Sequence, residues 1–140
     1  MGGSVLNRLM SRKGYLLGNE PKVGDGATYM AYSDRYPLSV VADFKVGKKA
    51  LSRILKLQED NAKLVSGSML SEGQEYVYSE NPDGAVYYVR EVDVYEDGVL
   101  KGRVYEEVYK NEKGNYVLVN NKNKYPIVFG MKEKYRDPSF

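Results

Sequence analysis

Apolar and polar residues alternate most regularly over residues 85–95 (AVYYVREVDVY). Because successive side chains of a β-strand point to opposite faces, this alternation predicts a long strand with two different faces. Residues 96–98 (EDG) then favour a tight reversal, and residues 99–109 (VLKGRVYEEVY) alternate again. The sequence therefore predicts a long β-hairpin over about 85–109.

Shorter segments of similar composition lie on both sides of this hairpin. They predict strands at about 27–33, 38–44, 53–59, 74–79, 116–120 and 125–129. Residues 50–65 also fit a helix in part, but the spacing of Leu55 and Leu57 favours a strand. Pro37 is expected to interrupt the chain between the first two strands, and Pro126 is expected at a sheet edge.

These elements predict a mainly β protein of the α+β class. We expect a twisted antiparallel sheet or a small, partly open barrel, because short strands are joined by tight turns. Residues 1–20 are predicted to be an N-terminal extension with a short helix at about 4–12, and residues 21–140 a single β-rich domain. A long hairpin also exposes edges, which favours pairing with a second subunit.

Composition excludes several kinds of chemistry. The 140 residues contain no Cys, no His and no Trp, so a thiolate nucleophile, a Ser–His pair and a Cys/His zinc site are impossible. No calcium loop or phosphate-binding Gly-rich loop is present. A net charge of +2 does not favour binding to a nucleic acid duplex. No apolar run is long enough to cross a bilayer, and residues 1–20 lack the pattern of a signal peptide. We expect a binding protein rather than an enzyme, without a cofactor or metal.

Tyrosine is abundant, with 14 residues. Its rings suit sheet packing and protein interfaces, and one or two of them could also stack on a base.

Two segments could bind an anion. Asp34, Arg35 and Tyr36 precede Pro37, where the arginine presents its planar fork to a phosphate or instead pairs with the aspartate. The closing segment contains Lys132, Lys134, Tyr135 and Arg136. These residues form either an anion-binding patch or a solvated chain terminus.

Several of these segments carry a resemblance to a known family. They are residues 23–28 (VGDGAT), 33–37 (SDRYP), 40–41 (VV), 58–63 (QEDNAK), 69 with 71–76 (M, SEGQEY), 129–130 (FG) and 135–140 (YRDPSF). Together they resemble small proteins of bacteriophages and prophages that include the first type of Thoeris anti-defence protein. The resemblance touches about 21–79 and 126–140. The family pattern has an arginine soon after the closing glycine, whereas Gly130 is followed here by Met131, Lys132 and Glu133.

The resemblance implies a sponge for an immune signal in the cytoplasm of an infected bacterial host. Family members sequester the cyclic ADP-ribose isomer made by a bacterial TIR sensor, some also hold cyclic oligonucleotides, and they form oligomers built from dimers. Carried over to this chain, the phosphates would be held by Arg35, Lys132 and Arg136. Tyr36 or Tyr135 would stack, and sugar hydroxyls would be bound by Gln58, Asn61 or Gln74. Asp34, which could orient Arg35, and Lys134 of the closing patch complete the expected ligand-binding residues.

Two other classes of function stay open from the residues alone. A phage inhibitor of a host defence protein, comparable to an anti-CRISPR, could use the Tyr-rich hairpin as its contact surface. An enzyme that cleaves the signal would have to rely on carboxylates or magnesium, because histidine and cysteine are missing.

Overall fold

A computed structural model describes residues 14–31, 34–66, 75–119, 126–132 and 134. The described residues form strands and turns and contain no helix. The strands are β1 (Gly14–Leu16), β2 (Gly26–Met30), β3 (Arg35–Val46), β4 (Ser52–Glu59), β5 (Asn61–Ser66), β6 (Glu75–Ser79), β7 (Val86–Glu96), β8 (Val99–Lys110), β9 (Tyr116–Leu118) and β10 (Ile127–Phe129). The expectation of a mainly β chain is therefore confirmed.

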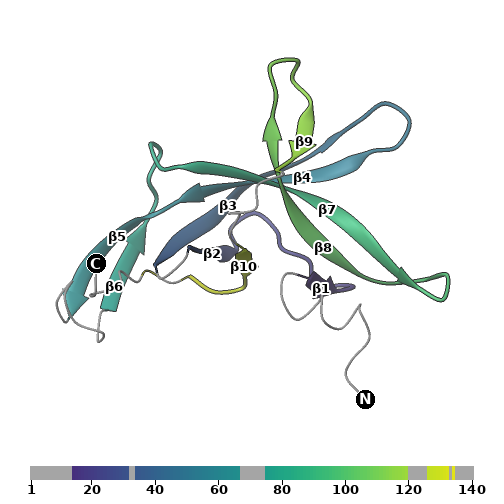
Figure 1. Ribbon diagram of the computed structural model, residues 1–140. Helices are drawn as coiled ribbons and strands as arrows, with labels where there is room; N and C mark the ends of the chain where they lie inside the picture. The colour runs from purple at the N-terminus through teal and green to yellow at the C-terminus, as the bar shows by residue number, and fades with distance from the viewer. Residues whose placement is uncertain (1–13, 32–33, 67–74, 120–125, 133, 135–140) are drawn as a thin grey trace.

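Eight of the strands form one antiparallel sheet (Figure 1). Its order is β1-β8-β7-β4-β3-β2-β10, with β9 added to β8, while β5 and β6 form a separate two-stranded sheet. Among the described strands, the end strands β1 and β10 do not pair with each other, so the main sheet is open and is not a closed barrel. Figure 1 shows the β5–β6 hairpin projecting from one side of the main sheet, opposite the tips of the β3–β4 and β7–β8 hairpins.

The long predicted hairpin is present as β7 and β8. Asp97 and Gly98 form its turn with φ of 53° and 76°, the left-handed conformation that a two-residue hairpin turn requires. The other predicted strands are confirmed as β2, β3, β4, β6, β9 and β10, and β10 lies at an edge of the sheet. The helix predicted at 4–12 lies outside the described residues, and β1 at 14–16 pairs with β8.

Pro37 does not interrupt the chain as the sequence predicted. Strand β3 begins at Arg35, and Pro37 pairs with Thr28 of β2. The carbonyl of Pro37 accepts a hydrogen bond from the backbone N–H of Asp60 at 2.9 Å. Because the N and O atoms of one residue in an antiparallel strand point to the same side, the nitrogen of Pro37 also faces Asp60. The N–H that proline lacks would face the Asp60 carbonyl, one residue beyond the end of β4, so the β3–β4 ladder from Leu38 onward is not affected.

The hydrophobic core lies on one face of the main sheet. Its centre consists of Leu38 and Val40 of β3, Leu55 and Leu57 of β4, and Val89 of β7, all at most 1% exposed. The core is completed by Ala27, Tyr105 and Ile127, with Tyr29, Tyr87 and Phe129 packed against it. Burial of each leucine contributes about 1.5–3 kcal/mol, and Ile54, buried on the opposite face of β4, adds to this.

The same face continues into an ion-pair network near the N-terminal segment. Arg53, two residues before Leu55, binds Asp43 at 2.9 Å and Glu91 at 2.7 Å and donates to the carbonyl of Pro21 at 2.7 Å. The hydrogen bond with Asp43 raises the pKa of the Arg53 guanidinium. The network thus ties the segment before β2 to the sheet. It also includes Glu20, Asp93, Arg103 and the Tyr105 hydroxyl.

No helix in the described part of the chain has the length and apolar character needed to cross a membrane. Among the same residues, no group of three or more acidic side chains is placed to hold a metal ion.

Candidate functional site

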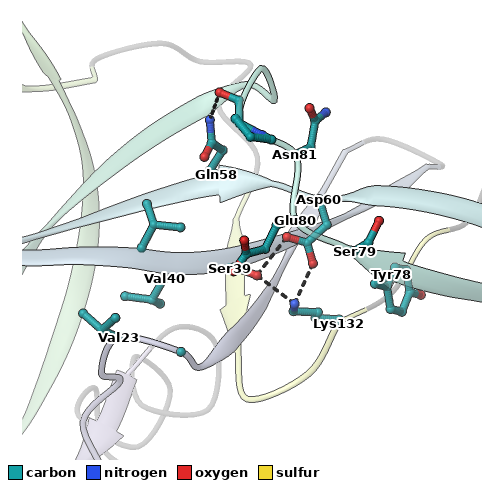
Figure 2. Close-up of a pocket in the computed structure, with 13 residues that line it drawn as sticks. Val23, Ser39, Val40, Gln58, Asp60, Tyr78, Ser79, Glu80, Asn81 and Lys132 are labelled. Carbon is teal, nitrogen blue, oxygen red and sulfur yellow. Dashed lines mark hydrogen bonds and ion pairs between the residues drawn. The ribbon is translucent and has the colours of Figure 1, made fainter.

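A pocket of about 540 Å³ lies where the main sheet meets the β5–β6 hairpin (Figure 2). A pocket of this volume accommodates a small organic ligand. Its walls come from the turn before β2, from β3, from the end of β4, from the end of β6 and from the segment after β10. The lining residues are Val23, Gly24, Ser39, Val40, Val41, Gln58, Asp60, Tyr78, Ser79, Glu80, Asn81, Pro82 and Lys132.

A buried carboxylate lies in the wall of this pocket. Asp60 is 6% exposed, and its two oxygens have separate partners. The hydroxyl of Ser39 donates to Oδ1 at 2.8 Å, and the ammonium of Lys132 binds Oδ2 at 2.5 Å. Lys132 Nζ also donates to the Ser39 hydroxyl at 2.7 Å, which closes a ring of three groups. Such pairing compensates for the free-energy cost of burying a charge.

The backbone explains how the three groups meet. Asp60 is the single residue between β4 and β5, and the β3–β4 register places Ser39 opposite Gln58. Lys132 follows β10, which pairs with β2, and the aliphatic part of its side chain packs against Gly26 of β2. A Cβ at Gly26 would lie 2.7 Å from Lys132 Cγ, so the absence of a side chain leaves room for the lysine.

The amide of Gln58 forms a second polar wall. Its Nε2 donates to the carbonyls of Pro82 at 2.8 Å and Gly84 at 3.2 Å. These carbonyls belong to a tight turn at residues 81–84, whose Asn-Pro-Asp-Gly sequence favours a reversal. The Gly84 N–H closes the turn by donating to the Asn81 carbonyl at 3.0 Å. The turn therefore fixes the orientation of the Gln58 side chain.

An aromatic cluster adjoins the pocket through Tyr78. The Tyr78 hydroxyl accepts a hydrogen bond from the Lys134 N–H at 2.8 Å, and Lys134 Nζ lies 4.2 Å from the centre of the Tyr36 ring. Tyr36 donates to Asp34 at 3.3 Å. Tyr29 stacks on Tyr87 with centroids 5.0 Å apart. Burial raises the pKa of Tyr87 to about 12. The cluster is thus a packed set of tyrosine rings, with the ammonium of Lys134 over the ring of Tyr36.

The structure brings some of the predicted site residues together. Gln58 and Lys132 line one pocket, and Asn61 donates to the carbonyl of Glu80 in its wall at 3.2 Å. Asp34, Tyr36 and Lys134 form the neighbouring cluster, while Arg35 is exposed at the start of β3. The remaining candidates lie outside the described residues: Gln74, Tyr135 and Arg136.

Sequence reasoning missed Ser39, Asp60 and Tyr78. No local pattern around these residues indicates a pocket, since each reaches it through long-range pairing of strands. The tyrosines of the β7–β8 hairpin differ in exposure, and Tyr87 and Tyr88 are half-buried. Tyr95 and Tyr109 are 62% and 50% exposed, whereas Tyr105 is 3% exposed in the core.

Comparison with known proteins gives no match to any family model, to any curated protein or to any solved structure.

Proposed function

We propose that the protein is a phage-encoded binder that sequesters a cyclic nucleotide immune signal without cleaving it, in the cytoplasm of an infected bacterium. The observation that carries this proposal is the polar pocket in which Gln58 and Lys132 meet. Gln58 belongs to a segment that resembles the anti-defence family, and Lys132 lies in the closing segment, where the family pattern has an arginine. Side-chain amides, hydroxyls and an ammonium are groups that bind sugars, bases and phosphates. The ligand is a cyclic ADP-ribose isomer or a cyclic oligonucleotide.

We further propose that the protein assembles as a homodimer or a higher homo-oligomer. The main sheet carries exposed apolar side chains, among them Val86 of β7, Val99 of β8 and Leu118 of β9 at 41%, 53% and 44%. A second copy would cover such surfaces and the open strand edges. Light scattering at two protein concentrations tests this proposal, which a single monomeric species at both concentrations would refute.

Calorimetric titration tests the proposed binding activity. The purified protein is titrated with cyclic ADP-ribose isomers and with cyclic di- and trinucleotides, and each complex is then heated to release the ligand. Tight binding followed by recovery of unchanged ligand is the expected result. Recovery of an altered ligand would make the protein an enzyme, and no binding across the panel would contradict the proposal.

Two single substitutions connect the activity to the pocket. Gln58→Leu removes the amide at nearly constant volume, and we expect it to weaken binding about tenfold, the effect of about 1.4 kcal/mol from lost hydrogen bonding. Lys101→Ala is the matched control, because Lys101 is an exposed residue of β8 outside the pocket lining. Equal affinity of both variants would place the ligand elsewhere.

A second candidate function is direct inhibition of a host defence protein. The exposure of Tyr95 and Tyr109 on the β7–β8 hairpin favours it, since tyrosine is enriched at protein contacts. The double variant Tyr95→Ala/Tyr109→Ala should then abolish anti-defence activity in infected cells while calorimetric binding of nucleotides is unchanged. Retained activity of that variant would exclude the hairpin as the contact surface.

A further inference from the structure

The charges around the pocket limit which part of a ligand can enter. The described lining residues include one ammonium, Lys132, and two carboxylates, Asp60 and Glu80. Lys132 is already bound to Asp60 at 2.5 Å and to Ser39 at 2.7 Å. A phosphate in this pocket would therefore compete with a buried carboxylate for the lysine and would face Glu80 as well. Repulsion between like charges makes this unfavourable.

The Gln58 amide offers an acceptor to the pocket rather than a donor. Carbonyl oxygens only accept hydrogen bonds, so the contacts with Pro82 and Gly84 identify the atom facing the turn as Nε2. Figure 2 shows the amide oxygen on the side away from that turn. This oxygen accepts no hydrogen bond from the described part of the chain. A ligand with an N–H or O–H group can donate a hydrogen bond to it.

Lys132 supplies the complementary donor. Its ammonium has three N–H groups, of which two are directed at Ser39 and Asp60. The third can donate to an oxygen or nitrogen of a ligand, while the carboxylate and the hydroxyl hold the ammonium in place.

The opposite wall is apolar. Val23 and Val41, 55% and 41% exposed, present its apolar surface, whereas the side chain of Val40 is 1% exposed and belongs to the core. In Figure 2, Val23 and Val40 lie on one side of the view, Asp60 and Tyr78 lie on the other, and Ser39 lies between them. A flat ring with polar groups along one edge matches a pocket that has one apolar wall and one hydrogen-bonding wall.

We propose that this pocket receives the uncharged part of the ligand, the base and ribose of a nucleoside, and that the phosphates stay outside it. This inference rests on the proposed function and makes it more specific. Gln58 accepts a hydrogen bond from the ligand, Lys132 donates one, and Asp60 with Ser39 positions the lysine. Lys132 therefore serves as an oriented donor and not as the group that neutralises phosphate.

Competition calorimetry with the unmodified protein tests this assignment. The cyclic nucleotide that binds best is displaced with adenosine, with guanosine and with inorganic pyrophosphate in separate titrations. We expect one of the nucleosides to compete and pyrophosphate not to compete. Because the recognised groups are uncharged, the affinity for the cyclic nucleotide should change less than about twofold between 50 and 300 mM salt.

The outcomes separate this inference from the proposed function. Binding of a cyclic nucleotide that pyrophosphate displaces and nucleosides do not would overturn the inference and leave the sponge activity intact. A decrease in affinity of about tenfold or more over the same salt range would do the same, since it indicates contacts with phosphate. If no cyclic nucleotide and no nucleoside binds, both proposals are refuted.

Discussion

Replacing Lys132 with methionine leaves the Asp60 carboxylate without its ammonium partner. The side chain of Asp60 is 4% exposed and that of Lys132 is 29% exposed. Removing one member of a buried ion pair costs about 3–5 kcal/mol, because the remaining charge stays desolvated. The Ser39 hydroxyl still donates to Asp60, and water can enter where the lysine was partly exposed. We therefore expect Lys132→Met to lower the free energy of unfolding by about 2–3 kcal/mol.

The reverse change is expected to be milder. In Asp60→Asn the ammonium of Lys132 can turn to solvent, and the amide still accepts a hydrogen bond from Ser39, so the loss is about 1 kcal/mol. In the double variant no buried charge remains, and its loss should be smaller than the sum of the two single losses.

Urea denaturation followed by circular dichroism measures these differences, with Lys101→Met as the surface control. The reasoning is refuted if Asp60→Asn destabilises the protein as much as Lys132→Met does. It is also refuted if the losses of the two single variants add up in the double variant.

Three further variants test other parts of the fold. Gly26→Ala places a Cβ 2.7 Å from Lys132 Cγ and should cost about 1–3 kcal/mol in urea denaturation; an unchanged midpoint would contradict the contact. Arg53→Met leaves Glu91, 13% exposed, without the Arg53 guanidinium and with Arg103 at 3.2 Å as its remaining cation, and should cost about 2 kcal/mol; a loss below about 0.5 kcal/mol would show that the network is dispensable. Tyr87 has its pKa raised to about 12, so the proton is held more tightly in the folded state. Stability should be complete below about pH 10 and decrease between about pH 10 and 12. Tyr87→Phe should reduce this decrease, and an identical pH dependence in the variant would contradict the assignment.

Local chemistry was sufficient to predict most of the sheet. The β7–β8 hairpin follows from alternation and from a turn sequence that allows positive φ at Asp97 and Gly98. Pro37 was misjudged, because a proline breaks a ladder only where its N–H is needed, and that depends on where a distant strand ends. Strand β5 at Asn61–Ser66 carries no clear alternation, and its pairing with β6 is what identifies it as a strand.

The candidate site was only partly visible for a similar reason. Gln58 and Lys132 were suggested by the segments in which they occur. Asp60 lies in the same sequence segment as Gln58, but its burial depends on the β3–β4 register and on a lysine 72 residues further along the chain. Sequence alone cannot show that this lysine is paired with a carboxylate, and hence that its charge is not available to a phosphate.

Nuclear magnetic resonance of the ¹⁵N-labelled protein tests the central claim most directly, that the pocket beside Asp60 binds a nucleotide signal. The protein is titrated with cyclic ADP-ribose isomers and cyclic dinucleotides. We predict saturable shifts of the Gln58 side-chain amide and of the backbone amides of Asp60, Tyr78 and Lys132, while the Asp97–Gly98 turn stays unchanged. Shifts confined to the β7–β8 hairpin, or no shift with any of these compounds, would contradict the claim.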